Sequence, residues 1–199
     1  MLERFFPKHK FRALLFDFDG TIADTMPAHL DAWNKALKVY DLTLSKEQHL
    51  EWAGRPTRQI VELLNSKHGT KISPDEFSRA KEHDYLASIK QVKAIASVVE
   101  IIKFYDGKIP MAVVSGSRHR PVETTLDHLG LTEHFDAVIC AEDYKNGKPD
   151  PDCFLLAAEK LGVAPADCLV FEDAALGIEA ARRAGMACIR VTGDHKLSK

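Results

Sequence analysis

The sequence predicts an α/β protein in which a parallel sheet carries an inserted segment made only of helices. From residue 97 onward, short apolar runs alternate with helix-like periodicity, a pattern that is typical of βαβ units. Residues 24–93 show helical patterning throughout, and they follow directly on a short apolar run near the N-terminus. The alternation predicts one parallel sheet, and the strand-free stretch predicts an insertion after its first strand.

The first predicted strand is the apolar run at 12–16, which ends at Asp17 and Asp19. Side chains two positions apart on a strand point the same way, so both carboxylates are expected on one side. Such crowded carboxylates repel each other unless a cation lies between them. Open parallel sheets bind ligands outside the carboxyl ends of their strands, which favours a binding site here. Taken alone, the stretch leaves a less favoured alternative, an Asp19-Gly20 turn after a core strand with one solvated aspartate.

A helix is predicted after this strand. Asp24 and Thr25 can cap it, and Pro27 suits its first turn. At about 100° per residue, one face collects the larger apolar side chains, with His29 at its edge. The apolar face comprises Met26, Leu30, Trp33, Leu37 and Tyr40.

The rest of the inserted segment contains two further helical stretches, at 59–67 and 74–90. The loop Gly54-Arg55-Pro56-Thr57 precedes them. We therefore predict two domains: a core of residues 1–23 and 94–199, and an all-α cap of residues 24–93.

The core is predicted to be a Rossmann-like parallel sheet of about five strands with helices on both faces. After the first strand, the remaining strands are expected at 110–114, 135–140, 168–171 and 187–191. The helices between them are expected at 98–105, 122–129, 152–161 and 175–184.

Polar residues follow these strands where each one ends. Ser115 and Ser117 follow the second strand, and Glu172-Asp173 follow the fourth. Lys148 lies in a proline-stiffened loop after the third. Because the carboxyl ends of parallel strands share one edge, these side chains should converge with the two aspartates. Each has an ordinary alternative: a serine capping a turn or helix, a solvated loop lysine, or acids at a helix N-terminus.

Four converging carboxylates need a cation, and oxygen ligands suit a hard divalent ion such as Mg²⁺. With Mg²⁺ and Lys148 in place, the site would become a receptor for phosphate, assisted by Ser115 and backbone amides. Asp17 or Asp19 could then attack phosphorus and form an aspartyl phosphate, while the other acts as general acid and base. The residue pattern alone leaves open which aspartate takes which role.

The composition of the chain excludes several classes of binding partner. Its 199 residues carry a net charge of -2, which offers no electrostatic basis for binding nucleic acid or a membrane surface. The four cysteines are scattered with no CxxC pair, as expected of small buried side chains in a reducing cytoplasm rather than of a zinc site. No targeting segment or membrane span is recognisable. We expect a cytoplasmic monomer that binds a small phosphorylated metabolite.

The sequence resembles the haloacid dehalogenase superfamily, in its subgroup with a helical cap after the first strand. The four matching motifs are Asp17-Phe18-Asp19-Gly20-Thr21, Val113-Val114-Ser115-Gly116-Ser117, Lys148-Pro149 and Phe171-Glu172-Asp173. They occur in the family's order and span nearly the whole chain.

The resemblance implies that Asp17 is the nucleophile and that Asp19 is the general acid and base. It also implies that Mg²⁺ binds Asp17, the backbone carbonyl of Asp19, and Asp173, with Glu172 at or next to the ion. Ser115 and Lys148 would hold the transferred phosphate, together with Gly116 and Ser117 of the second motif. A second aspartate counts against a true dehalogenase, which has no leaving alkoxide to protonate.

Within the superfamily, the chain is most similar to β-phosphoglucomutase-like enzymes, and especially to small bacterial fructose-1-phosphate and 6-phosphogluconate phosphatases. Thr25 and His29 match both groups, and Lys81 matches a cap lysine of these enzymes. Gly54-Arg55-Pro56-Thr57 resembles the phosphatases' cap loop, with Arg55 in place of a serine. The mutases carry a cap-loop arginine where this chain has Thr57, although Arg55 and Arg58 are neighbours. The ordinary alternatives are a half-buried helix histidine for His29 and an exposed helix lysine for Lys81.

The resemblance favours a Mg²⁺-dependent phosphatase acting on small sugar phosphates through an aspartyl phosphate. The alternative on the same scaffold is a β-phosphoglucomutase, in which a sugar hydroxyl replaces water as the acceptor. A response-regulator receiver domain also places carboxylates, a hydroxyl and a lysine at strand ends, but it lacks a long helical insertion. A catalytically silent sugar-phosphate binder is disfavoured because no catalytic position is missing.

Overall fold

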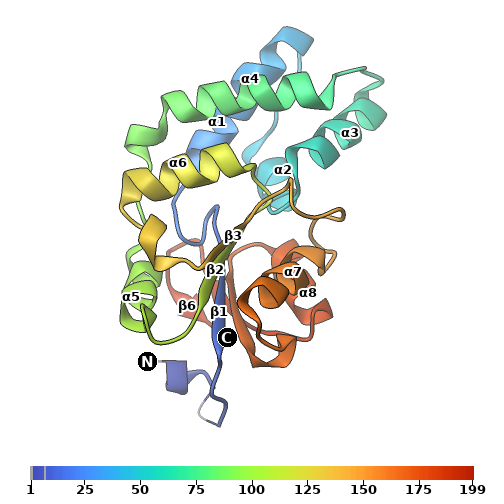
Figure 1. The fold of residues 1–199 in the computed structure, drawn as a ribbon. Helices are drawn as coiled ribbons and strands as arrows, with labels where there is room; N and C mark the ends of the chain where they lie inside the picture. The colour runs from blue at the N-terminus through green and yellow to red at the C-terminus, as the bar shows by residue number, and fades with distance from the viewer. Residues whose placement is uncertain (1, 7) are drawn as a thin grey trace.

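The computed structural model of the protein describes residues 2–6 and 8–199, and within these ranges it contains one six-stranded sheet (Figure 1). Its strand order is β3-β2-β1-β4-β5-β6. The strands are β1 (Ala13–Asp17), β2 (Met111–Val114), β3 (Ala137–Ile139), β4 (Cys168–Glu172), β5 (Ala187–Val191) and β6 (Leu197–Ser198). β1 pairs in parallel with both β2 and β4, so the chain's first strand lies at the centre of the sheet. The predicted parallel α/β core is confirmed.

β6 is an addition that the sequence analysis did not predict. It pairs antiparallel with β5 through only two residues, a length at which alternation of apolar side chains carries no signal. The third strand is also shorter than the predicted 135–140, because only Ala137–Ile139 pair with β2. The other strands lie within one or two residues of their predicted positions.

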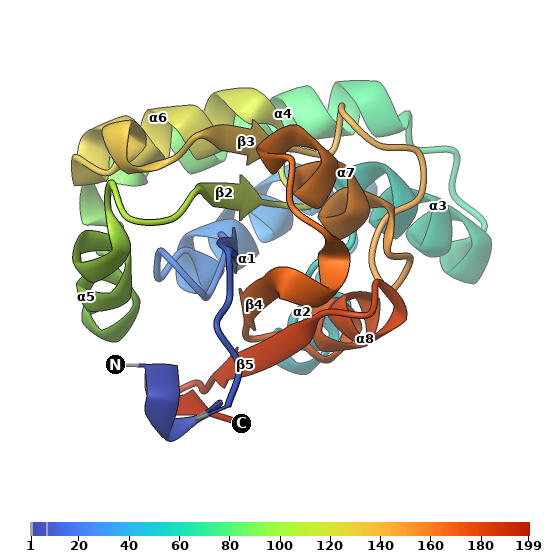
Figure 2. The same ribbon diagram turned by 60° about the horizontal axis from the view of Figure 1, so that its bottom comes forward.

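Alternating side chains give the sheet two apolar faces. On β1, Leu14 and Phe16 pack toward α5 (Ala96–Tyr105) and α6 (His119–Leu129). Ala13 and Leu15 pack on the other side, against α7 (Asp152–Leu161) and α8 (Ala175–Arg183). Figure 2 shows the two helical layers on opposite faces of the strands. Both faces of the parallel sheet are thereby shielded from water.

The inserted segment is a group of helices at the carboxyl-end edge of the sheet, at the top of Figure 1. It consists of α1 (Met26–Leu37), α2 (Lys46–Glu51), α3 (Thr57–His68) and α4 (Pro74–Ala87). These helices share an apolar cluster of their own, which includes Trp33, Leu37, Val61 and Phe77. The all-helical character predicted for this segment is therefore correct.

Three details of the helical segment were predicted wrongly. α2 was missed, although Ser45 and Gln48 form a capping box at its start, which is a recognisable signal. Helix α4 ends at Ala87 rather than near residue 90, where a separate 3-10 turn follows. Tyr40 lies in the 3-10 turn after α1 and is exposed, so it leaves the predicted apolar face.

Two short connections join the helical segment to the sheet, and they lie side by side. The backbone N–H of Asp24 donates to the carbonyl of Lys93, and that of Ile95 donates to the carbonyl of Ile22, at 2.9 and 2.8 Å. The chain thus leaves and re-enters the core at one place, close to the domain boundaries predicted at 23/24 and 93/94. No helix in the described ranges is both long and apolar enough to cross a lipid bilayer.

Candidate active site

A buried lysine links the ends of two neighbouring strands. Lys148 Nζ lies 2.6 Å from Oδ1 of Asp17 and 2.7 Å from Oε2 of Glu172, and its side chain is fully buried. Burial alone would lower the pKa of Lys148, but the charges of the two carboxylates raise it well above its ordinary value. The alternative of a solvated loop lysine is therefore wrong for Lys148.

Three carboxylates beside this lysine form a group able to hold a metal ion. Asp17, Glu172 and Asp173 each present an oxygen within 4.8 Å of the others. Burial, followed by the charge of Glu172, raises the pKa of Asp17 well above its ordinary value and that of Asp173 to about 7. These shifts mark negative charge that Lys148 does not fully offset. Two buried carboxylates and the partly buried Asp173, with excess negative charge, fit a hard divalent cation.

Gly20 is required beside this group. Its φ is +91°, and a Cβ atom there would lie 2.4 Å from Oδ2 of Asp173. Only glycine tolerates both conditions, so the chain can turn after Asp19 while keeping Asp173 close to the strand end. The Asp19-Gly20 turn is therefore part of the candidate site. The turn and the binding site, given above as alternatives, are both present.

Asp19 faces a different set of partners from Asp17. Its Oδ1 accepts hydrogen bonds from Thr25 Oγ1 at 2.7 Å and from His29 Nε2 at 2.8 Å. Its Oδ2 accepts from Ser115 Oγ at 3.2 Å and from Ser117 Oγ at 2.7 Å. Burial would raise the pKa of Asp19, but His29 and the hydroxyl donors hold it well below its ordinary value. The two aspartates are thus set apart electrostatically, one crowded by acids and the other surrounded by donors.

The helical segment supplies buried basic groups next to Asp19. His29 is 5% exposed and stacks on the ring of Tyr85 at 4.1 Å between centroids. Burial and the nearby Lys81 charge lower the pKa of His29, and its buried Nδ1 has no hydrogen-bond partner within residues 2–6 and 8–199. Lys81 is 9% exposed, its Nζ lies 5.4 Å from the Trp33 ring centroid, and burial lowers its pKa to about 8. The alternatives of a half-buried His29 and an exposed Lys81 are therefore wrong, because both side chains are buried.

The loop that starts at Gly54 closes over the strand ends. A Cβ atom on Gly116 would lie 2.6 Å from the carbonyl oxygen of Gly54, and one on Gly147 would lie 2.4 Å from the Pro56 ring. Gly54 itself has φ +85°, and a Cβ there would lie 3.3 Å from Lys148 Cδ. The backbones of the loop and of the core therefore touch, and access to Asp17 and Lys148 is closed from this side.

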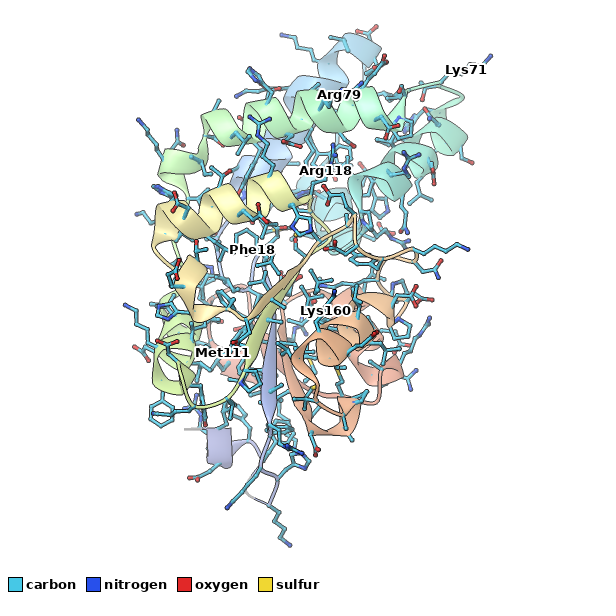
Figure 3. All side chains as sticks on the ribbon, viewed as in Figure 1. Phe18, Lys71, Arg79, Met111, Arg118 and Lys160 are labelled. Atoms are coloured by element: carbon cyan, nitrogen blue, oxygen red, sulfur yellow. The ribbon has the colours of Figure 1, made fainter. Side chains whose placement is uncertain are left out.

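In the described part of the chain, three of the cavities lie between the helical segment and the core. One of them, about 410 Å³, lies between α1, α2 and the pair Gly20 and Asp173. The other two adjoin α3 and α4. The outer one has a volume of about 370 Å³ and is lined on the core side by Gly116 and Arg118. The inner one, about 20 Å³, is lined by His29, Lys81 and Ser117. Both are lined by Thr57, Ser78 and Arg118, so they are neighbours. The inner one also reaches His29 and Ser117, two of the hydrogen-bond partners of Asp19. Figure 3 labels Arg118 where the start of α6 faces α3 and α4.

The two arginines predicted near the cap loop lie in different surroundings. Arg58 lines the outer cavity, and its Nη2 pairs with Oδ1 of Asp75 at 2.6 Å. Arg55 lines neither the outer nor the inner cavity, and its Nε is buried with no hydrogen-bond partner among the described residues.

Sequence reasoning missed several residues that shape this site. Gly177 lies in α8 where a Cβ would come within 1.9 Å of Glu172 Oε2, and a glycine inside a helical pattern was the available signal. Tyr144 donates its hydroxyl to the carbonyl of Ser115 at 3.0 Å. Arg118 pairs with Glu142 at 3.0 Å on the cavity wall. Nothing in the local pattern singles out Tyr144 or Glu142, because their partners are remote in sequence.

Comparison with known proteins matches residues 14–191 to the family described as haloacid dehalogenase-like hydrolase. The chain is 38% identical over 182 residues to the fructose-1-phosphate phosphatase YqaB of Escherichia coli, covering 92% of this chain and 97% of that protein. It is 30% identical over 189 residues to the beta-phosphoglucomutase of Bacillus subtilis, covering 90% and 83%. A solved structure named as a putative beta-phosphoglucomutase from Bacteroides vulgatus superposes with a TM-score of 0.82 at 27% identity, covering 96% and 80%.

The chain therefore belongs to the haloacid dehalogenase-like hydrolase family. This excludes the receiver-domain alternative, since the matched region spans the helical segment as well as the sheet.

Proposed function

We propose that this protein is a Mg²⁺-dependent phosphatase that hydrolyses small sugar phosphates through an aspartyl phosphate on Asp17. The observation that carries the proposal is the separation of the two aspartates. Asp17 is paired with Lys148 among carboxylates, whereas Asp19 is held by four hydrogen-bond donors. Two carboxylates with opposite pKa shifts are typical of a nucleophile and an acid-base group that work together. The similarity to a fructose-1-phosphate phosphatase supports the choice of substrate class.

Asp17, Asp173 and the backbone carbonyl of Asp19 would hold Mg²⁺, with Glu172 at or next to the ion. The bound ion would supply positive charge to the phosphate oxygens and to the crowded carboxylates. Glu172 is held by Lys148 and by the backbone N–H of Ala174, which donates at 3.1 Å, so its orientation is set by the core. Lys148 would bind the transferred phosphate while keeping Asp17 oriented.

In the first step, Asp17 Oδ would attack phosphorus while the bond from phosphorus to the sugar oxygen breaks. Asp19 would give a proton to the leaving oxygen and release the sugar. Since its donors keep Asp19 ionised in the structure, it would have to take up that proton as substrate binds and Ser115 turns away. In the second step, water would attack phosphorus, Asp19 would take the water's proton, and the acyl phosphate bond would break to free inorganic phosphate. The donors around Asp19 favour its ionised form, which is the form that the second step needs.

The substrate would be held by groups from both sides of the cavity. Ser115 now donates to Asp19, and its hydroxyl would turn to a phosphate oxygen, beside the backbone of Gly116 and Ser117. His29 and Lys81 face the inner cavity, and Arg58 faces the outer one. Gly54, Arg55 and Thr25 would position the loop and helix that present these groups.

Residues 24–93 would act as a cap that opens and closes. In the closed arrangement the Gly54–Pro56 loop touches Gly116, Gly147 and Lys148, so a substrate cannot reach Asp17 past it. Opening at the paired connections near residues 23 and 94 would admit substrate, and closing would exclude bulk water during the first step.

The alternative function is that of a β-phosphoglucomutase, and the similarity to the Bacillus subtilis enzyme supports it. A mutase returns phosphate to a sugar hydroxyl, so it converts β-glucose 1-phosphate to glucose 6-phosphate with a bisphosphate primer and frees no phosphate. Measuring both products in one reaction distinguishes the two activities.

Phosphate release with Mg²⁺ from fructose 1-phosphate, 6-phosphogluconate and β-glucose 1-phosphate tests the proposal. We expect turnover that stops on chelation, and a loss on the order of 10⁴-fold or more in Asp17→Asn. Asp31→Asn removes the same charge from the exposed side of α1 and should retain activity. Release that persists in Asp17→Asn, or that needs no divalent ion, would contradict the mechanism.

A further inference from the structure

The positive charges on the wall of the outer cavity are mostly paired. Arg58 pairs with Asp75 at 2.6 Å, and Arg118 pairs with Glu142 at 3.0 Å, and all four side chains line the cavity. Glu142 also accepts hydrogen bonds from the backbone N–H of His119, at 3.2 and 3.4 Å, which fixes it at the start of α6. The remaining cation of the lining is the exposed Lys145.

The rest of the lining is rich in uncharged polar groups. Thr57, Gln59, Ser78 and Tyr144 line the same wall. The hydroxyls of Ser78 and Tyr144 donate to the carbonyls of Pro74 and Ser115, so toward a ligand they can act as acceptors. Such groups, and carboxylates that accept hydrogen bonds, are suited to the hydroxyls of a sugar. A second phosphate or a carboxylate on the substrate would instead lie beside Asp75 and Glu142, and it would have to compete with them for the arginines.

We propose that Asp75 and Glu142 are specificity-determining residues, which favour an uncharged polyhydroxylated tail over one that carries a second anionic group. This inference rests on the proposed phosphatase function, and it deepens that function by naming the substrate class: monophosphorylated sugars or polyols. The arginines orient the tail through its hydroxyls, while their paired carboxylates repel a distal phosphate or carboxylate.

The strength of this selection follows from the exposure of the pairs. Arg58 and Asp75 have side chains 57% and 70% exposed, and Arg118 and Glu142 are 46% and 37% exposed. Pairs exposed to this degree contribute little to stability and are screened by salt, so removing one carboxylate should leave the fold intact. The same exposure limits each carboxylate to a modest effect on specificity, which should shrink as ionic strength rises.

The test compares kcat/KM for fructose 1-phosphate with kcat/KM for 6-phosphogluconate and for fructose 1,6-bisphosphate, at low ionic strength. In Asp75→Asn and in Glu142→Gln, we expect the ratio to shift toward the doubly charged substrates by about three- to tenfold. The glutamine can keep the acceptor for the His119 N–H. Glu76→Gln, next to Asp75 but outside the cavity lining, removes one charge as a control and should leave the ratio unchanged.

The two hypotheses fail in different ways. Ratios that stay at the wild-type value in both cavity variants would overturn the specificity proposal while the phosphatase function stands. A shift of the same size in Glu76→Gln would also overturn it, because a long-range effect of net charge would then explain the result. If the wild-type protein frees no phosphate from any of the three compounds, the proposed function itself fails.

Discussion

Two lysines are buried on opposite sides of the candidate site, and their surroundings differ completely. Lys148, from the loop after β3, lies within 2.7 Å of two carboxylates, which raise its pKa well above the ordinary value. Lys81, from α4, has no carboxylate within salt-bridge distance in the described part of the chain. Burial lowers its pKa to about 8.

The difference shows how the two regions are built. At the strand ends, the core brings a cation and its counter-charges together, so the charges stabilise one another whether or not a ligand is bound. In the helical segment, a cation is held away from water with no carboxylate at salt-bridge distance among the described residues, and the more distant charges of Asp19 and Glu82 only partly offset the cost in free energy. We infer that the core region is organised in advance, while the helical region is completed by an anionic substrate.

The largest effect is expected from removing the compensated lysine. Lys148→Met leaves the carboxylates of Asp17 and Glu172 buried without their cation. Breaking a buried ion pair from one side costs about 3–5 kcal/mol, and we also expect loss of nearly all phosphate release. Urea unfolding with a chelator present, together with phosphate release, measures both effects.

Lys145→Met is the control for this prediction, since Lys145 is exposed three residues away. Its unfolding free energy should match that of the wild type. Wild-type stability in Lys148→Met would show that the two carboxylates do not depend on this lysine.

The next largest effect is expected when a methyl group is added at Gly177, next to the Glu172 carboxylate. In Gly177→Ala, the new Cβ would meet Oε2 of Glu172 at 1.9 Å and push the carboxylate away from Lys148. We expect kcat/KM to fall about 100-fold and stability to fall by about 1–3 kcal/mol. In Gly193→Ala the added atom meets nothing within 4 Å, so this variant should behave like the wild type. Equal behaviour of the two variants would refute the role given to Gly177.

Lys81 should make the stability of the protein depend on pH. Because the pKa of Lys81 is about 8 in the folded protein and about 10.4 in the unfolded chain, the unfolded state binds more protons between these values. Stability from this residue should therefore rise as pH increases from 8 to 10.4, by about 2–3 kcal/mol. Lys81→Met should lack this rise and should be the more stable protein at pH 7.

Denaturant unfolding at pH 7, 8, 9 and 10 measures this dependence. Lys67→Met, at an exposed position of α3, is the matched control and should keep the wild-type pH profile. If the free energy of unfolding of Lys81→Met changes with pH as that of the wild type does, Lys81 does not cause the pH dependence, and its pKa is not lowered in the folded protein.

Much of the architecture was predictable because its signals are local. The apolar runs before Asp17, Ser115 and Glu172 marked three neighbouring strands, and the parallel arrangement then placed their ends on one edge. Short elements were lost where pattern length was insufficient, as for β6. Helix α2 is six residues long, too short for a clear helical period, and its local signal is the capping box of Ser45 and Gln48.

The sequence by itself determined the order of elements and the inserted helices, since both follow from periodicity. It also predicted the grouping of Asp17, Lys148, Glu172 and Asp173, from strand direction and from the order of the four motifs. Only the tertiary structure decided that Asp19 faces α1 rather than the other carboxylates, that Lys81 is buried, and that Arg58 and Arg118 are paired. These features depend on side chains brought together from helices and loops far apart in the chain. Local sequence patterns do not predict such contacts, because the contacts form only when the helical segment packs against the core.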